Sequence, residues 1–247
     1  MNIEITDLTR RFGRTRAVDG VNLRTDTGVF GLLGPNGAGK TSLLRMLATV
    51  VPPSSGSMRL LERDPSEHRP RREIRRRLGY LPQNLGYYPG FTVVDFVEYF
   101  ALLKEMPPRQ VPKAVAAAVE RVGLGDKAKA KLRTLSGGML RRVGIAQAIV
   151  NDPELLLFDE PTAGLDPEQR VEFRSLLREL GQGATVVVST HLVEDVGAAC
   201  VEVALMHQGR IAFHGTPDEL VARGNSHGTG DAPLERGYSA VLAEARA

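Results

Sequence analysis

The segment 34–41 has the residue types and spacing to hold the phosphates of a nucleotide. It reads Gly-Pro-Asn-Gly-Ala-Gly-Lys-Thr, a full G-x-x-x-x-G-K-T loop. Glycines let backbone N–H groups curl around phosphate oxygens, and a helix that begins at Lys40 would add the positive end of its dipole. Lys40 would place a cation on the β- and γ-phosphates, and Thr41 would offer a hydroxyl ligand to Mg²⁺. The candidate nucleotide contacts are Gly34, Pro35, Asn36, Gly37, Ala38, Gly39, Lys40, Thr41 and Ser42.

A second candidate site lies at 155–160, where four apolar residues are followed by two carboxylates. The apolar run predicts a buried strand, so Asp159 stands at its carboxyl end, where α/β folds bind ligands. Asp159 would hold Mg²⁺, largely through water, and Glu160 would polarise an attacking water as general base. Such a strand end alone is more often a plain turn, and the phosphate loop in the same chain favours the functional interpretation.

A third motif, Leu-Ser-Gly-Gly-Met at 135–139, opens a predicted helix. A Ser-Gly-Gly segment at a helix N-terminus is a second place where an anion could bind. Its sequence is also that of an ordinary linker or helix cap, so the motif is not diagnostic by itself.

Alternating strands and helices must position these motifs. The apolar run 29–33 predicts a strand buried on both faces, and apolar spacing over 40–50 predicts a helix, so strand, glycine loop and helix form half of a parallel α/β unit. The segment 91–150 is almost purely helical, with one helix capped by Thr92 and Asp95 and another by Ser136. Two later helices follow Asp166-Pro167 and Thr216-Pro217. Further strands are expected at 3–8, 21–23, 78–81, 155–158, 185–189, 201–206 and 210–213.

The domain organisation follows from this pattern. We expect one domain over 1–223, with a core at 1–89 and 151–223 and a helical insertion at 90–150. The glycine-rich segment 224–230 predicts a flexible linker, and the amphipathic segment 234–247 is expected to dock loosely or to swing.

Composition excludes several classes of protein. Of the 247 residues 42% are hydrophobic and 25% charged, and the net charge is only +3, too small for a dedicated polyanion binder. The arginine cluster at 69–77 has no interleaved aromatic residue, so we expect a solvated helix face and not a nucleic-acid contact. A single cysteine, Cys200, and the lack of a signal peptide or an apolar span of about 18 residues predict a protein of the cytoplasm.

The three motifs occur in the order found in ABC-type ATPases, and from residue 1 to about 223 the chain resembles the nucleotide-binding subunit of ABC transporters. The resemblance implies an α/β fold in which a P-loop NTPase core carries an antiparallel β subdomain and an inserted helical signature subdomain. It also implies ATP and Mg²⁺ as cofactors.

The resemblance assigns roles to four more residues. Gln83 matches the glutamine that joins the core to the helical subdomain and senses Mg²⁺ and the γ-phosphate, and His191 matches the switch histidine that contacts that phosphate. Asp166 lies in the loop that crosses the dimer interface, and Phe12 in the place of the aromatic residue that stacks on adenine. Taken singly, each of these residues would be read as an ordinary loop, core or surface residue.

The family's mechanism joins two chains head-to-tail over two ATP molecules. Ser136, Gly137 and Gly138 of a second protomer would complete each site, whether that protomer is a copy of this chain or a different cassette. Met139 stands where many members carry glutamine, which looks like an export-type branch, while Glu160 is retained.

The resemblance therefore implies an ATPase that powers a separate membrane permease and lies peripherally on the inner face of the cell membrane, and the Met139 form of the motif favours export. Tyr87 and Tyr88 either pack internally or line the groove that receives the permease. The alternatives are an ABC-type ATPase outside transport, acting on nucleic acid, the ribosome or a membrane complex, and a small-molecule kinase, which the signature helix disfavours.

Overall fold

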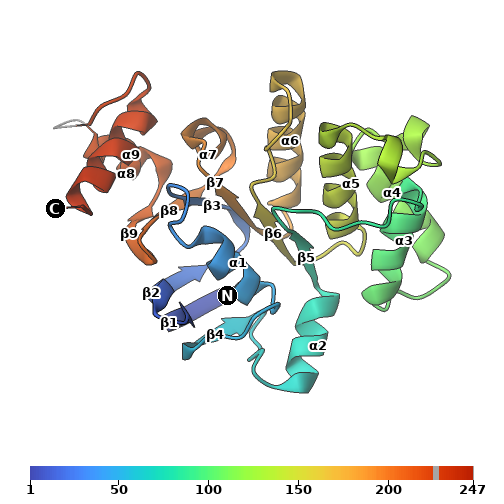
Figure 1. The fold of residues 1–247 in the computed structure, drawn as a ribbon, viewed down its shortest axis with the longest axis horizontal. Helices are drawn as coiled ribbons and strands as arrows, with labels where there is room; N and C mark the ends of the chain where they lie inside the picture. Colours follow the sequence, from blue (N-terminus) through green and yellow to red (C-terminus); the bar gives the residue numbers. More distant parts are fainter. Residues whose placement is uncertain (225–227, 247) are drawn as a thin grey trace.

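The computed structural model describes residues 1–224 and 228–246, which form two sheets surrounded by helices (Figure 1). The strands are β1 Ile3–Phe12, β2 Thr15–Thr25, β3 Gly28–Leu33, β4 Ser55–Leu60, β5 Leu78–Leu81, β6 Leu155–Asp159, β7 Thr185–Thr190, β8 Glu202–His207 and β9 Arg210–Gly215. The α-helices are α1 Lys40–Leu47, α2 His68–Arg76, α3 Val93–Leu103, α4 Val111–Arg121, α5 Gly137–Ile149, α6 Pro167–Leu180, α7 Val193–Ala199, α8 Pro217–Arg223 and α9 Pro233–Glu244. Over the described residues, no helix combines the length and the apolar character that crossing a membrane requires.

The central sheet has the order β5-β6-β7-β3-β8-β9, with β9 antiparallel to β8 and the other pairs parallel. Its inner strands are buried on both faces, as their continuous apolar runs predict. Successive residues of β7 point to opposite faces of the sheet. Val187 joins the core around α1, whereas Val186 and Val188 join the core that includes α5 and α6. The α/β architecture predicted from the sequence is confirmed.

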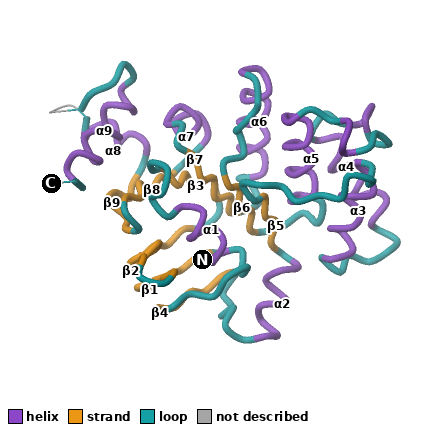
Figure 2. The backbone as a smooth tube through the Cα atoms, viewed as in Figure 1, coloured by secondary structure: helices purple, strands orange, loops and turns teal. Residues whose placement is uncertain are grey.

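A second, antiparallel sheet with the order β2-β1-β4 covers α1 from the side opposite the central sheet (Figure 2). Ile3 and Ile5 of β1 pack in one core with Leu43 and Leu44 of α1. Helix α1 is therefore held between two sheets, and the loop that precedes it has a fixed position.

The helical region predicted after residue 90 forms α3, α4 and α5 at one end of the molecule (Figure 1). The expected cap of α3 is present, since Asp95 N–H donates to Thr92 Oγ1 at 3.2 Å and Thr92 N–H donates to Asp95 Oδ2 at 2.8 Å. The expected cap of α5 is present too, since Met139 N–H donates to Ser136 Oγ at 3.3 Å. Val97, Val115 and Ile145 place the three helices in one apolar cluster.

The expectation that the segment 234–247 docks loosely is wrong for the residues that the structure describes. Helix α9 lies along α8, and Val241 and Leu242 are buried in one cluster with Leu220. Gly237 lies so close to α8 that an added Cβ would overlap the carbonyl of Leu220. This close approach of two backbones depends on a glycine inside the helix, which the amphipathic pattern alone does not reveal. Of the predicted linker, residues 225–227 lie outside the described part of the chain.

The arginine cluster at 69–77 lies in α2 and at its C-terminal cap, where the sequence predicts a solvated helix face. Several of these arginines bind within the chain: Arg72 and Arg76 pair with Glu105, and Arg75 Nε donates to Thr49 Oγ1 at 2.7 Å. These contacts join α2 to the end of α3 and to the turn after α1. They give the cluster a structural role within this chain.

Candidate active site

Strand register brings the three reactive segments to one edge of the central sheet. β3 pairs with β7 so that Leu33 lies opposite Thr190, and β6 pairs with β7 so that Asp159 lies opposite Ser189. The strands are parallel, so the glycine loop, the Asp159 turn and the loop after β7 all leave the sheet at its carboxyl edge.

The glycine loop is shaped by its own chain. Gly34 and Gly39 have φ values of 153° and 107°, in the region that favours glycine. A Cβ on Gly34 would overlap the carbonyl of Met206, and one on Gly39 would overlap the carbonyl of Ala17. The loop borders a pocket of about 250 Å³. The pocket is lined by Ala17, Asn36, Gly37, Ala38, Gly39, Lys40, Thr41, Ser42, Gln83 and Glu160.

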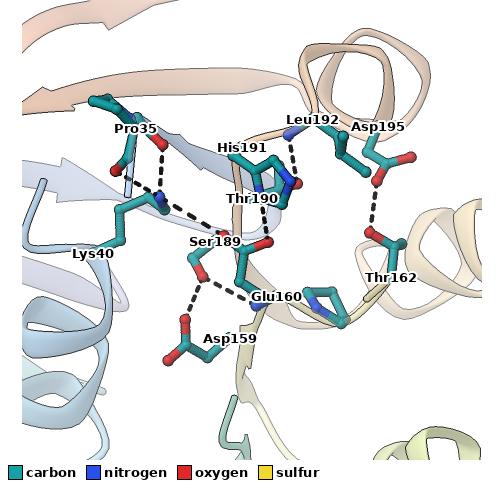
Figure 3. Close-up of polar contacts among 12 residues, drawn as sticks. Pro35, Lys40, Asp159, Glu160, Thr162, Ser189, Thr190, His191, Leu192 and Asp195 are labelled. Atoms are coloured by element: carbon teal, nitrogen blue, oxygen red, sulfur yellow. Dashed lines mark hydrogen bonds and ion pairs between the residues drawn. The ribbon is translucent and has the colours of Figure 1, made fainter. Parts of the chain in front are cut away.

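Lys40 supplies the cation of this pocket. Its Nζ donates to the carbonyl oxygens of Gly34 at 2.6 Å and Pro35 at 3.2 Å and lies 3.7 Å from Glu160 Oε1 (Figure 3). Burial lowers the pKa of Lys40, and the charges of Glu160 and Asp159 oppose that change. A positive charge is thus held beside the loop that would receive phosphate.

Asp159 fits the part of a magnesium ligand. The residue is fully buried, and its Oδ1 accepts from Ser189 Oγ at 2.6 Å and from Thr41 Oγ1 at 3.2 Å. Its Oδ2 has no hydrogen-bond partner among the described residues. A buried carboxylate oxygen without a partner, beside a hydroxyl, matches the oxygen ligands that Mg²⁺ prefers. Among the described residues, no cluster of three His, Cys, Asp or Glu side chains suited to a metal occurs.

Glu160 and His191 form a bonded pair at the same edge. His191 Nδ1 lies 2.9 Å from Glu160 Oε2, with the carboxylate buried and the imidazole half exposed. Glu160 has a φ of 51°, unusual for a residue with a side chain. Its N–H donates to the Ser189 carbonyl at 3.1 Å and to Ser189 Oγ at 3.2 Å. The carboxylate is therefore held in one orientation, as general-base chemistry requires.

Gln83 lines the pocket, whereas Phe12 lies outside its lining, at the end of β1. Gln83 lines the pocket beside the glycine loop, as the predicted sensor of phosphate and metal should. Phe12 is 48% exposed at the end of β1, and the Arg10 guanidinium lies 4.8 Å from its ring centroid. An exposed ring of this kind offers a face on which a planar base could stack.

The structure does not bring the Ser136 motif to this pocket. Ser136, Gly137 and Gly138 begin α5, at the helical end of the molecule, while the pocket lies at the start of α1 (Figure 1). An added Cβ on Gly138 would lie 2.9 Å from Gln169 Oε1, and one on Gly137 would meet no other atom of the described residues within 4 Å. Asp166, expected at a dimer interface, caps α6 by accepting from Gln169 N–H at 2.9 Å.

Two residues important to the site's geometry are absent from the sequence-based prediction. Ser189 bonds both Asp159 and Glu160, and its place at the end of a strand next to β6 is the signal that could have indicated it. Arg141 binds carbonyl groups of two loops from inside α5, and nothing in a helical run with two adjacent arginines distinguishes it from a surface residue.

Comparison with known proteins identifies the family. The family model described as ABC transporter matches residues 18–163. The Nod factor export ATP-binding protein I of Ralstonia nicotianae is 38% identical over 221 residues, covering 89% of this chain and 68% of that protein. The same protein of Paraburkholderia xenovorans is 39% identical over 224 residues, covering 89% and 72% of the two chains.

Solved structures agree in fold. An ATP-binding subunit of an ABC transporter superposes with a TM-score of 0.86 at 22% identity, covering 98% of this chain and 100% of that one. A dimeric ATP-binding cassette in a post-hydrolysis state with ADP and Pi gives a TM-score of 0.80 at 25% identity, covering 87% and 98%. The chain therefore belongs to the ABC transporter family, as one of its ATP-hydrolysing cassettes.

Proposed function

We propose that this chain is the ATPase subunit of an exporter and that it powers a separate membrane permease. The named relatives are export ATP-binding proteins, and Met139 in the helix-opening motif agrees with an export-type cassette. The subunit would work on the inner face of the membrane, attached through the permease.

One observation carries the proposal for the chemistry: a cation and a base line one pocket, and a candidate metal ligand accepts a hydrogen bond from Thr41, which lines the same pocket. Lys40 begins α1, and Asp159 and Glu160 lie at the end of β6 and just after it. Lys40 contacts Glu160, and Ser189 bonds both Asp159 and Glu160 (Figure 3). Lys40 would neutralise phosphate charge, and the glycine-loop N–H groups would hold the phosphate oxygens. Mg²⁺, held by Thr41 and Asp159, would stabilise the charge that builds up on the phosphates.

Glu160 would act as the general base that takes a proton from the attacking water. His191 contacts its Oε2, which leaves Oε1 near Lys40 at 3.7 Å. His191 would fix the carboxylate and reach the γ-phosphate from its exposed side, while Gln83, which lines the pocket, would contact Mg²⁺ and that phosphate. Phe12 would stack on the adenine base.

We further propose that the site is completed by a second cassette. The open position of Gly137 and the distance of α5 from α1 support a role for Ser136, Gly137 and Gly138 on the nucleotide of a partner chain. The solved relative in a dimeric, ADP-bound state supports the same arrangement. Two chains would then close head-to-tail over two nucleotides and open after hydrolysis.

The surface that would meet the permease lies just beyond Gln83. Tyr88 is 61% exposed and stacks near Phe91, with ring centroids 5.1 Å apart. Tyr87, in contrast, packs partly against the apolar cluster of the helical region. We propose Tyr88 as the anchor for an apolar helix of the permease, with Tyr87 as its support.

The test uses the full chain co-expressed with a candidate permease from a neighbouring reading frame. We expect phosphate release from MgATP and recovery of the chain in the membrane fraction. A Tyr88→Ala variant should keep phosphate release in solution and lose most of its membrane recovery, whereas Val171→Ala, another exposed apolar position, should keep both. Absence of the wild-type chain from membranes would refute the transporter function, and unchanged recovery of Tyr88→Ala would refute the anchor.

A further inference from the structure

A buried arginine in α5 joins two loops of the active site. Arg141 is 7% exposed, and within the described part of the chain its guanidinium donates only to backbone carbonyl oxygens. Two belong to the loop after β5, those of Pro82 at 2.9 Å and Gln83 at 3.0 Å. The others lie at the end of β6 and in the turn that follows it, and are those of Asp159, Glu160 and Pro161, the last at 3.2 Å.

This use of a buried cation is unusual. Buried charges are normally paired with an opposite charge, because losing hydration costs several kcal/mol. Among the described residues no carboxylate forms a salt bridge with Arg141. Burial lowers the pKa of Arg141, and the charges of Asp159 and Glu160 oppose that change from a distance. A guanidinium has five N–H donors in a rigid fork, which suits several carbonyls held in a fixed arrangement.

The bound carbonyls flank the residues that do chemistry. β5 and β6 pair in parallel, so their following loops leave the sheet side by side, and Arg141 reaches both from α5. Glu160 has its φ at 51°, and such a conformation persists only where neighbouring contacts fix it. The carbonyls of residues 159–161 that Arg141 holds surround this backbone position.

We propose that Arg141 is a positioning residue that locks the Glu160 turn and the Gln83 loop to helix α5. This inference rests on the proposed function, since it concerns the same hydrolytic site. Because Ser136 opens that helix, a rotation of α5 would move the base and the sensor glutamine together. Movement of the Ser136 end against a partner's nucleotide would thereby reach the chain's own Glu160.

A change at Arg141 should lower the rate of hydrolysis and leave nucleotide binding nearly unchanged. Arg141 donates no hydrogen bond to the glycine loop or to Lys40, so the loop should still hold nucleotide when Arg141 is changed. Displacement of Glu160 should lower the rate, because errors of about 1 Å in a reacting group cost up to about a hundredfold.

The experiment compares Arg141→Met with Arg142→Met, a matched control on the same helix. Arg142 makes only long contacts, of 3.4 and 3.5 Å, to the carbonyls of Val122 and Gly123, away from the site. We expect Arg141→Met to lower kcat at least tenfold while KM and the Kd for MgATP change less than about threefold. Arg142→Met should match the wild type in both.

Arg141→Lys serves as a second variant, because a lysine keeps the charge and can reach fewer carbonyls. We expect it to fold and to show an intermediate kcat, and it decides the question if Arg141→Met does not fold. Wild-type kcat in either folded Arg141 variant would overturn the proposal, and so would a loss of MgATP affinity equal to the loss of kcat. A wild-type chain that releases no phosphate would instead overturn the proposed function.

Discussion

Two helices of this chain begin with glycines suited to bind an anion, yet their surroundings differ. At α1, Gly34 and Gly39 are required by the chain itself, because a side chain at either would overlap a neighbouring carbonyl. At α5, a side chain on Gly137 would meet no described atom within 4 Å. Lys40, Asp159 and Glu160, the proposed cation, metal ligand and base, all lie near α1. We therefore propose the α1 end as the chemical site and the α5 end as a set of N–H donors for a ligand held by another chain.

The sharpest test of this difference removes the base from the α1 end. Glu160→Gln should bind MgATP with near wild-type affinity and release phosphate at least about a hundredfold more slowly, because the amide cannot accept the proton. Phosphate release and titration calorimetry measure the two quantities. A rate within a few-fold of wild type would mean that the base lies elsewhere.

The same variant should accumulate as an ATP-bound dimer, because closure no longer ends in hydrolysis. Light scattering at saturating MgATP checks the mass, with the nucleotide-free protein as control. A monomer under these conditions would count against pairing between copies of this chain.

A smaller effect is expected when the α5 end is blocked. Gly137→Val should leave thermal stability unchanged and lower phosphate release about tenfold, since a branched side chain would cover the exposed N–H groups. Gly183→Val is the control, since Gly183 also faces open space but lies at the amino edge of β7. A stable Gly137→Val variant with full activity would remove the reason for assigning this end to a partner's nucleotide.

Mixing variants tests whether the two ends act in different chains. Lys40→Ala disables the α1 end and Gly137→Val the α5 end, so a mixed dimer retains one site with both ends intact. An equal mixture should recover roughly a quarter of the wild-type rate, because half of the random dimers are mixed and each holds one complete site. A mixture no more active than the separate variants would contradict completion by a second copy.

The smallest effect concerns α3, whose N-terminus is capped by its own residues Thr92 and Asp95. Thr92→Ala should lower the free energy of unfolding by about 1 kcal/mol and leave phosphate release unchanged. Urea unfolding measures the first quantity. A change in the hydrolysis rate would show that the α3 end also belongs to the site.

The cap of α3 also predicts how the free energy of unfolding depends on pH. Two hydrogen bonds lower the pKa of Asp95. The larger effect comes from the backbone N–H of Thr92, and the smaller one from the Thr92 side chain. The folded pKa lies below the unfolded one, so the stabilisation is present above about pH 4 and is lost as the pH falls through the folded pKa. Asp95→Asn should flatten the acid limb of the stability profile relative to Asp126→Asn, whose carboxylate side chain is 73% exposed.

Much of the fold was predictable because its signals are local. The apolar runs of β3, β6 and β7, the glycine loop and the caps Thr92, Ser136 and Asp166 all appear where the sequence predicts them. Strand β4 was missed because its residues Ser-Gly-Ser-Met-Arg-Leu bury only Met58 and Leu60. The packing of α9 depends on Gly237 touching another helix, which no local pattern encodes.

The positions of Lys40, Asp159 and Glu160 at one edge of the central sheet follow from their motifs, whereas the residues that hold them there were not predicted. Asp159 and Glu160 follow an apolar run, but Ser189 gains its role only through pairing of β6 with β7. Arg141 stands beside Arg142 in the sequence, and only the tertiary fold buries one and leaves the other with weak contacts. Residue type indicates chemistry, and long-range register decides which side chains support it.

The parallel register of β3, β7 and β6 also divides the chain into places that tolerate added length and places that do not. One residue inserted within β6 would turn Asp159 to the opposite face of the sheet and separate it from Thr41. The connection between α6 and β7 lies at the opposite, amino edge, where Gly183 faces open space. A reporter peptide inserted at 182–183 would therefore lengthen the chain without shifting any of the three segments that meet at the nucleotide pocket.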